Sequence, residues 1–286
     1  MEFVKMHGLG NDYIYVYLPR GDEGTDWPTV ARRVSHRHYG VGSDGLILVL
    51  PSDRADFRMR MFNADGSEAQ MCGNGMRCLA RFVYDRGLTQ KQELAVETLA
   101  GIIRPRLVVE GGKVTAVEVD MGVPRLRRAD IPMVGPPGDH VIGELLVVDG
   151  VKFPVTCLSL GNPHCVIFVE DVWQVEVEHT GPSIEHHPAF PERTNVEFVQ
   201  VLNQQELAMR IWERGSGITM ASGTGATASA VAAVLAGRCQ REVKVHQPGG
   251  TLEIVWRDDG HAWHRGPAEE ICTGVFTSGL TGGNVR

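Results

Sequence analysis

The stretches Cys72-Gly73-Asn74-Gly75 and Ser222-Gly223-Thr224-Gly225 are similar in pattern and stand 150 residues apart. After each stretch, apolar residues recur at three- and four-residue steps, over residues 75–85 and 225–236, and a glycine closes each run. This periodicity predicts two helices, each beginning at a glycine-rich turn. The second run consists largely of Ala and Val on all sides, so we expect that helix to be enclosed by other elements.

Further landmarks keep the same spacing in both halves of the chain. Phe62-Asn63 and Trp212-Glu213 each end nine residues before the glycine-rich stretch, at Asn63 and Glu213. Gly10-Asn11-Asp12 and Gly161-Asn162-Pro163 lie 61 and 60 residues before it, counted at the Asn. Ordered landmarks at a fixed offset indicate an internal repeat. The sequence therefore predicts two similar halves whose glycine-rich turns are able to face one another, with Cys72 on one side and Ser222 on the other.

Most of the remaining chain reads as short strands rich in Val, Ile and Leu between Gly or Pro turns. The clearest are residues 46–50, 102–109, 145–148, 165–169 and 251–256. Together with the two helices they predict a mixed α/β (α+β) fold. We expect two pseudo-symmetric domains, each a β-sheet or barrel wrapped around a central helix.

Composition excludes several classes of protein. The chain has 286 residues, enough for about two domains of roughly 150 residues each. Its 28 Lys and Arg against 35 Asp and Glu give a net charge of −7, which argues against nucleic acid as a partner. No apolar run approaches the roughly 18 residues of a membrane span, and residues 1–7 contain no apolar signal core. The protein is therefore expected in the reducing cytoplasm, with free thiols.

The six cysteines are scattered, and neither they nor the histidines show the spacing of a zinc site. No metal is expected, and no nucleotide-binding fingerprint is present. Five cysteines (Cys78, Cys157, Cys165, Cys239 and Cys272) are expected to be small buried apolar residues.

A glycine-rich helix start has a definite chemistry. Its unpaired N–H groups and the positive end of the helix dipole stabilise an anion such as a carboxylate. The same field lowers the pKa of a cysteine from its free value of about 8.5, so Cys72 is expected to be a competent base near neutral pH. Two such groups on either side of one carbon would remove a proton from one face and deliver one to the other, as in a two-base racemase or epimerase.

The motifs of the whole chain resemble those of diaminopimelate epimerase, a family of cofactor-independent enzymes that interconvert LL- and meso-diaminopimelate. The resemblance rests on residues 5–12 (KMHGLGND), 62–67 (FNADGS), 71–75 (MCGNG), 161–164 (GNPH), 194–196 (TNV), 212–215 (WERG) and 266–269 (GPAE). It implies a first domain of residues 1–120 plus 268–286, carrying Cys72, and a second of residues 121–267, carrying Ser222. The last strand returns to the first domain, and the active site lies in the cleft between the domains.

The resemblance also implies roles for single residues. Cys72 and Ser222 are the catalytic pair, and no cofactor is needed. The residues expected to bind the substrate are Asn11, Asn63, Gly73, Asn74, Asn162, Asn195, Glu213, Arg214, Gly223 and Thr224. His164 and Glu213 are expected to tune or orient the catalytic groups. The family further implies a place in lysine and peptidoglycan precursor synthesis, an amino-acid substrate as the partner, and a homodimer.

One position departs from the family pattern Glu-Thr-x-Ala-Cys-Gly-Thr-Gly, because this chain reads Ile218-Thr219-Met220-Ala221-Ser222-Gly223-Thr224-Gly225. A serine hydroxyl is a far weaker acid than a thiol and needs an adjacent base, which Glu213 or His164 would supply. Three explanations stay open: a natural working serine, an engineered replacement of cysteine, or a change of substrate. The alternatives are accordingly a cofactor-independent racemase or epimerase of another amino acid, and a catalytically impaired protein that binds an amino acid.

Overall fold

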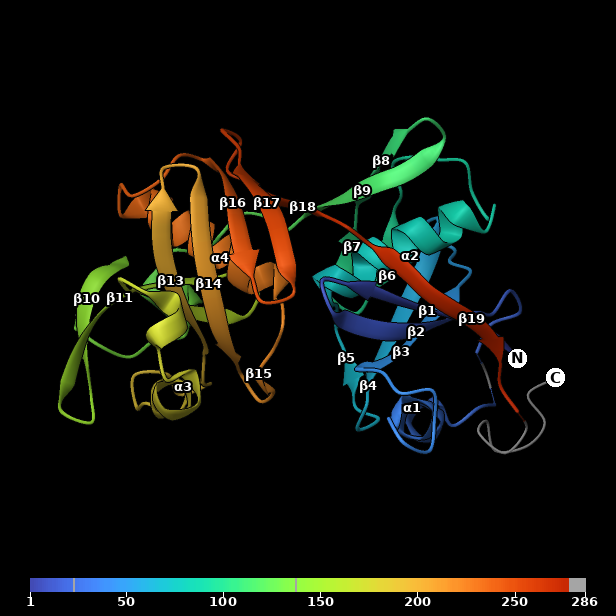
Figure 1. The fold of residues 1–286 in the computed structure, drawn as a ribbon, viewed down its shortest axis with the longest axis horizontal. Coiled ribbons are helices and arrows are strands. Elements are labelled where there is room, and N and C mark those ends of the chain that lie inside the picture. Colours follow the sequence, from blue (N-terminus) through green and yellow to red (C-terminus); the bar gives the residue numbers. More distant parts are fainter. Residues whose placement is uncertain (23, 137, 278–286) are drawn as a thin grey trace. The chain divides into compact units, whose positions relative to one another are not determined.

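The computed structural model describes residues 1–22, 24–136 and 138–277, and its contacts divide the chain into two compact units (Figure 1). Unit 1 comprises Met1–Val119 and the stretch that begins at Gly266, and unit 2 comprises Asp120–Arg265. Residues 278–286, which the sequence assigns to the first domain, lie outside the described residues. The chain thus completes unit 2 before it returns to unit 1.

Unit 1 is a mixed sheet with two helices. Its strands are β1 (Glu2–Gly8), β2 (Asn11–Tyr17), β3 (Gly45–Leu50), β4 (Phe57–Asn63), β5 (Glu68–Ala69), β6 (Val96–Thr98), β7 (Gly101–Ile103) and β19 (Glu269–Val275). They lie in the order β19-β1-β2-β3-β4-β6-β7, with β5 on β4, and β8 (Pro105–Glu110) and β9 (Lys113–Asp120) form a hairpin. The helices are α1 (Trp27–Ser35) and α2 (Gly73–Asp85).

Unit 2 repeats this plan. Its strands are β10 (Val141–Val148), β11 (Val151–Ser159), β12 (Pro163–Phe168), β13 (Asn195–Asn203), β14 (Glu206–Glu213), β15 (Gly217–Ile218), β16 (Glu242–Gln247), β17 (Gly250–Trp256) and β18 (Ala262–Gly266). They lie in the order β10-β11-β12-β13-β14-β16-β17-β18, with β15 on β14. The helices are α3 (Val177–Glu185) and α4 (Gly223–Leu235), and two 3₁₀ turns lie at Arg128–Asp130 and Val172–Gln174.

The central strand pairings of the two units correspond. Strands β2 and β3 are parallel and β3 and β4 antiparallel, as are β12 and β13, then β13 and β14. The strand that follows α2 is β6, and it pairs with β4 in parallel. The strand that follows α4 is β16, and it pairs with β14 in parallel. The prediction of two similar sheet-rich halves, each with a central helix, is therefore confirmed.

Helix α4 is enclosed, as its composition predicts. It contacts β11 to β14, β16 and β17, and in Figure 1 it lies behind β13 and β14. The small side chains of Ala226, Ala228 and Ala232 are fully buried and let the strands approach closely. Two buried hydroxyls bond within the helix, from Thr227 to the carbonyl oxygen of Gly223 and from Ser229 to that of Gly225, so no polar side chain disturbs the packing.

The sequence analysis missed two helices, α1 and α3. Helix α1 packs against β3 and β4, and its start carries an ordinary signal, because Asp26 accepts a hydrogen bond from the N–H of Thr29 and a proline stands in the first turn. Helix α3 contains Pro182, a residue that is unfavourable inside a helix. The predicted strand 102–109 is also wrong in part, because it divides into β7 and β8 before Pro105, which has no N–H for the ladder.

Within the described residues no helix is long and apolar enough to cross a membrane.

The start of β3 depends on a glycine. Gly45 pairs with Asn63 on one side and Tyr13 on the other, and a Cβ atom at this position would lie 2.2 Å from the carbonyl oxygen of Phe62. We expect Gly45→Ala to lower the free energy of unfolding by about 1–3 kcal/mol, because backbone must move to admit the methyl group. Urea unfolding monitored by circular dichroism measures the change. Gly138→Ala is the control, because a Cβ atom there meets nothing within 4 Å, and an equal effect of both changes would contradict the expectation.

Candidate active site

The first half-site, which is the group of side chains around Cys72, lies at the start of α2. Cys72 is the N-cap residue, with φ −139° and ψ 124°, and its Sγ accepts a hydrogen bond from the N–H of Gly75 at 3.4 Å. A Cβ atom at Gly75 would lie 2.7 Å from Cδ1 of Ile47. The glycine therefore lets the first turn sit directly on the sheet, with the sulfur at the positive end of the helix dipole.

Asn11, the first residue of β2, bonds to the groups around the thiol. Its Oδ1 accepts from the Cys72 thiol at 3.5 Å and from Nδ2 of Asn74 at 3.3 Å. Its Nδ2 donates to Oδ2 of Asp44 at 2.8 Å and lies 3.5 Å from the hydroxyl of Tyr13. Burial and the neighbouring Cys72 raise the pKa of Tyr13 well above its ordinary value, so the phenol stays protonated. The structure thus brings Asn11, Cys72 and Asn74 together.

Charged groups fix the orientation of these amides. The fully buried guanidinium of Arg77 donates to Oδ1 of Asn74 at 2.7 Å and to the carbonyl oxygen of Pro267 at 3.1 Å. At the other end, Arg37 donates to Asp44 at 2.8 Å. A guanidinium only donates, so Asn74 must turn its amide oxygen to Arg77. A carboxylate only accepts, so Asn11 must turn its amide nitrogen to Asp44.

The second half-site, around Ser222, lies at the start of α4 and matches the first. Ser222 is the N-cap residue, with φ −131° and ψ 123°, and its Oγ accepts from the N–H of Gly225 at 3.2 Å. A Cβ atom at Gly225 would again lie 2.7 Å from an isoleucine Cδ1, here of Ile211. Gln247 adds a contact, because its Oε1 accepts from the N–H of Ser222 at 2.7 Å.

Glu213, at the end of β14, lies beside Ser222. Its Oε1 accepts a hydrogen bond from the hydroxyl of Thr219 at 2.6 Å. Burial raises the pKa of Glu213, while hydrogen bonds from the hydroxyls of Thr219 and Ser222 act in the opposite direction. A carboxylate close to Ser222 would serve as the adjacent base that a serine requires.

A buried histidine and glutamate lie next to these groups. His164 Nδ1 is 2.6 Å from Oε1 of Glu197, and neither side chain is exposed to solvent. His164 Nε2 is 3.0 Å from Oδ1 of Asn162, whose Nδ2 donates to the hydroxyl of Thr224 at 3.5 Å. Burial raises the pKa of Glu197, and the charge of His164 opposes the shift. Asn162, His164 and Thr224 are therefore joined by contacts, as the sequence analysis expects of neighbours in one site.

Three expected substrate-binding residues lie outside these two groups of contacts. Asn63 ends β4 and donates through Nδ2 to the hydroxyl of Ser67 at 3.0 Å. Buried Asn195 donates to the carbonyl oxygen of Pro163 at 2.8 Å and accepts from the N–H of Arg214 at 2.9 Å. The guanidinium of Arg214 is exposed and bonds to the carbonyl oxygen of Glu192. Asn195 thus holds the turn that carries Arg214, and contact of these residues with substrate stays a prediction.

Sequence reasoning missed several residues of the two half-sites, namely Tyr13, Asp44, Arg77, Glu197, Thr219 and Gln247. Two of them could have been identified from the sequence, because each is a charged residue within an otherwise apolar run that forms a buried helix or strand. Arg77 lies among buried residues of α2, and Glu197 stands between Val196 and Phe198 in β13. Such a charge needs a partner, and its presence marks a polar network inside the fold.

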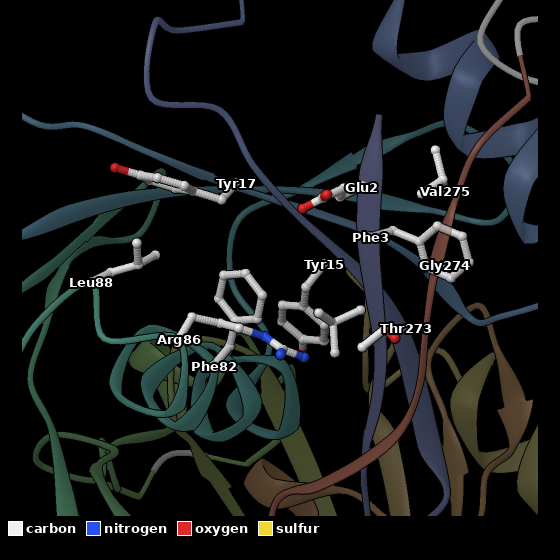
Figure 2. Close-up of a pocket in the computed structure, with 11 residues that line it drawn as sticks. Glu2, Phe3, Tyr15, Tyr17, Phe82, Arg86, Leu88, Thr273, Gly274 and Val275 are labelled. Atoms are coloured by element: carbon white, nitrogen blue, oxygen red, sulfur yellow. The ribbon is translucent and has the colours of Figure 1, made fainter.

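A further pocket lies outside the two half-sites. A pocket of about 490 Å³ lies between β1, β2, β19 and the end of α2 (Figure 2). Its walls are mainly apolar and include Phe3, Tyr15 and Phe82, with Glu2 and Arg86 as charged members, and none of the expected site residues lines it. Among the described residues, no three His, Cys, Asp or Glu side chains are grouped as ligands for a metal ion.

Comparison with known proteins identifies relatives over nearly the whole chain. The model of the family described as diaminopimelate epimerase matches residues 3–127 and 156–271. The chain is 58% identical to the diaminopimelate epimerase of Moorella thermoacetica, over 96% of this chain and 99% of the relative. It is 53% identical to that of Desulfitobacterium hafniense, over 96% and 98% of the two chains. That of Geobacillus thermodenitrificans is 49% identical, over 96% of each chain.

Solved structures share the fold at much lower identity. A phenazine biosynthesis protein of the PhzF family from Bacillus anthracis has a TM-score of 0.70 at 19% identity, covering 97% of this chain and 99% of its own. A probable proline racemase from Agrobacterium radiobacter has a TM-score of 0.67 at 15% identity, covering 96% and 92%. These similarities concern the fold alone.

The environments of the cysteines predict their reactivity. Burial raises the pKa of Cys78 to about 12 and that of Cys239 to about 11, whereas Cys72 is partly exposed at a helix start. Cys272 is exposed, and Cys239 is only partly buried, so the expectation that both are buried is wrong. We expect iodoacetamide to alkylate Cys72 fastest in the native protein near neutral pH, followed by Cys272. Peptide mass mapping over time measures the order, and native labelling of Cys78 as fast as Cys72 would contradict it.

Proposed function

The chain belongs to the diaminopimelate epimerase family, and we propose that Cys72 and Ser222 are the two groups through which it moves the α-proton of its substrate. It is an amino-acid isomerase that interconverts LL- and meso-diaminopimelate. The observation that carries the assignment of the pair is the match of the two helix starts. Each has an N-cap residue in the same conformation, and each cap carries a side chain able to take or give a proton.

The two helix starts suit the substrate carboxylate. The first-turn N–H groups at Gly73 and Asn74, and at Gly223 and Thr224, lie at the positive ends of α2 and α4. Negative charge on the carboxylate increases as the α-carbanion forms, so donors that are already in place stabilise the transition state more than the substrate. This proposal requires no cofactor, because the carbanion is stabilised by backbone donors.

Proton transfer balances in both directions. When Cys72 is the base, its thiolate takes the α-proton, and Ser222 delivers its hydroxyl proton to the opposite face. Glu213, if protonated, returns that proton to the serine oxygen. In the reverse reaction the oxygen of Ser222 takes the α-proton while its own hydroxyl proton passes to Glu213, and the Cys72 thiol protonates the opposite face. Ser222 is then never a free alkoxide, and this removes the objection that its hydroxyl is too weak an acid.

The residues around the pair are assigned to the rest of the substrate. We assign Asn11 and Asn162 to the reacting end, because each contacts its own half-site. Asn63, Asn195 and Arg214 are assigned to the distal amino-carboxylate end, where an exposed guanidinium offers a two-pronged contact to a carboxylate. We further propose that the enzyme works as a homodimer in the cytoplasm, without nucleic acid, in lysine and peptidoglycan precursor synthesis.

Exchange of the α-proton tests the pair. We expect LL- and meso-diaminopimelate to exchange their α-proton in D₂O with inversion, as followed by NMR. Cys72→Ala is expected to abolish inversion, and Ser222→Ala to slow it at least about 100-fold, because each removes one proton carrier. Ser222→Cys is expected to keep or raise activity.

Two outcomes would overturn parts of this proposal. Activity that appears only in Ser222→Cys would show that the serine does not work as a base in this chain. If neither form exchanges either isomer, diaminopimelate is not the substrate.

The pKa of Glu213 predicts the acid side of the pH profile. Glu213 must be ionised to take the proton of Ser222, and burial raises its pKa above the ordinary 4.5. In the direction in which Ser222 takes the α-proton, kcat/KM is therefore expected to fall as the pH drops through this raised value, since the protonated carboxyl no longer accepts. Glu213→Gln should lower the rate about 100-fold or more and remove this limb of the profile. An unchanged acid limb in Glu213→Gln would rule out Glu213 as the base.

A further inference from the structure

Glu185, at the end of α3, is a buried carboxylate that the mechanism above does not use. The residue is 2% exposed, and α3 contacts β14 and β15 in unit 2 (Figure 1). A buried charge destabilises the fold unless it finds partners inside. Nη1 of Arg193 is 3.7 Å from Oε1 and Nδ1 of His186 is 3.9 Å from Oε2, distances too long for hydrogen bonds. The hydrogen bonds to the carboxylate come from two other groups.

One of these groups belongs to the turn that joins β14 to β15 and carries Arg214. The N–H of Ser216 donates to the carbonyl oxygen of Glu213 at 3.1 Å, and Gly215, the third residue of the turn, has a φ of 76° that favours glycine. A β-turn of this kind makes only that one hydrogen bond of its own. The N–H groups of its two central residues, Arg214 and Gly215, therefore need acceptors from elsewhere in the fold.

Two side chains supply these acceptors. Oδ1 of Asn195 accepts from the N–H of Arg214 at 2.9 Å, and Oε1 of Glu185 accepts from the N–H of Gly215 at 3.1 Å. Asn195 also donates at 2.8 Å to the carbonyl oxygen of Pro163, a group that only accepts, so its own oxygen must be turned to the turn. Both central residues are thus held from outside the turn.

The second oxygen of Glu185 holds the strand that leads into the turn. Oε2 accepts from the indole N–H of Trp212 at 2.7 Å. Helix α3 approaches the indole closely, because a Cβ atom at Gly181 would lie 2.6 Å from Cβ of Trp212. Indole and backbone N–H groups only donate, so the direction of both bonds needs no assumption about protonation. The carboxylate thus bridges Trp212 and Gly215, the residues on either side of Glu213-Arg214.

Glu213 and Arg214 do not depend on this bridge equally. Glu213 is the last residue of β14, where it pairs with Gly217 of β15, and its Oε1 accepts from the hydroxyl of Thr219 at 2.6 Å. Arg214 lies beyond the end of the strand, and its backbone is held by the turn and by the acceptors outside it. Loss of the bridge should therefore displace Arg214 more than Glu213.

We propose that Glu185 is a positioning residue that, by bridging Trp212 and Gly215, holds Arg214 for the distal amino-carboxylate end of the substrate. The inference rests on the proposed function, in which Arg214 makes this contact. A two-pronged contact between a guanidinium and a carboxylate requires a defined backbone position, and bonds made before the substrate arrives supply it. Glu185 touches neither the substrate nor the reacting atoms in this scheme.

A double-mutant cycle tests this role. Glu185→Met removes both acceptors, keeps a side chain of similar length, and is made in the natural chain and in Arg214→Ala. kcat and KM for both diaminopimelate isomers are measured from α-proton exchange in D₂O. In the natural chain we expect KM to rise about 10-fold or more and kcat to fall less than about 3-fold. In Arg214→Ala, which lacks the distal contact, the same change should raise KM less than about 3-fold.

Control variants guard against a general loss of structure. Glu178→Met is the matched control, because Glu178 is exposed on the same helix, and it should leave kcat and KM unchanged. Glu185→Gln keeps the size of the side chain and one acceptor, so it repeats the cycle with less disturbance of the interior. We expect it to raise KM about 3-fold or more in the natural chain only. Thermal melting confirms that each variant is folded.

Hydrogen exchange measures the bond to the turn without any substrate. NMR of the unliganded protein follows the exchange of the Gly215 N–H with solvent. We expect this exchange to be about 10-fold or more faster in Glu185→Met than in the natural chain or in Glu178→Met. A general loss of stability would speed exchange throughout unit 2, whereas loss of this bond acts on the turn.

The outcomes separate this inference from the proposed function. An unchanged KM, an equal rise in the natural and Arg214→Ala chains, a fall in kcat alone, or unchanged exchange at Gly215 would overturn the role of Glu185 and leave the epimerase assignment standing. A KM that Arg214→Ala leaves unchanged would overturn the distal assignment of Arg214 and this inference with it. Absence of α-proton exchange in every form, the natural chain included, would overturn the proposed function itself.

Discussion

The start of a buried helix is the constraint on which the rest of this structure depends. At the first turns of α2 and α4 the backbone N–H groups have no partner within the helix, and the sheet packs so closely that only glycine fits at Gly75 and Gly225. Side chains at the N-cap must therefore complete the turn, and Cys72 and Ser222 do so by accepting from these glycines. The same bonds bring both reactive atoms to the positive end of a helix.

Charged neighbours then determine the orientation of the asparagine side chains. In unit 1 the buried guanidinium of Arg77 sets Asn74, and Asp44 sets Asn11. In unit 2 Asn162 contacts His164, which is paired with Glu197. An asparagine alone has two nearly equal orientations, whereas a donor-only or acceptor-only neighbour leaves one. The asparagines of the first half-site are thus oriented before substrate arrives, and orientation held in advance is what a proton transfer requires.

The sequence predicts local features of the fold better than its distant contacts. Periodicity predicts the two central helices, and repeated spacing predicts the matching halves. Each helix nevertheless begins two residues earlier than predicted, because its start is set by the N-cap residue and not by the first apolar residue. Asn11, Cys72 and Asn74 carry motifs, and the structure joins them by contacts. The contact of Glu197 with His164 spans 33 residues and depends on the parallel pairing of β12 with β13, which no local pattern encodes.

The exchange of a thiol for a hydroxyl at one of two matched helix starts shows what the repeat leaves free to vary. The helix start needs an acceptor for the glycine N–H, and sulfur and oxygen both serve. Proton transfer needs more, because oxygen holds its proton more tightly than sulfur near neutral pH. A backbone that tolerates either atom therefore leaves the supply of a base to the neighbouring side chains, and Glu213 beside Ser222 is the residue that we propose for this role. Two copies of one framework can thus hold groups of different acidity, provided that the copy with the weaker acid supplies a base.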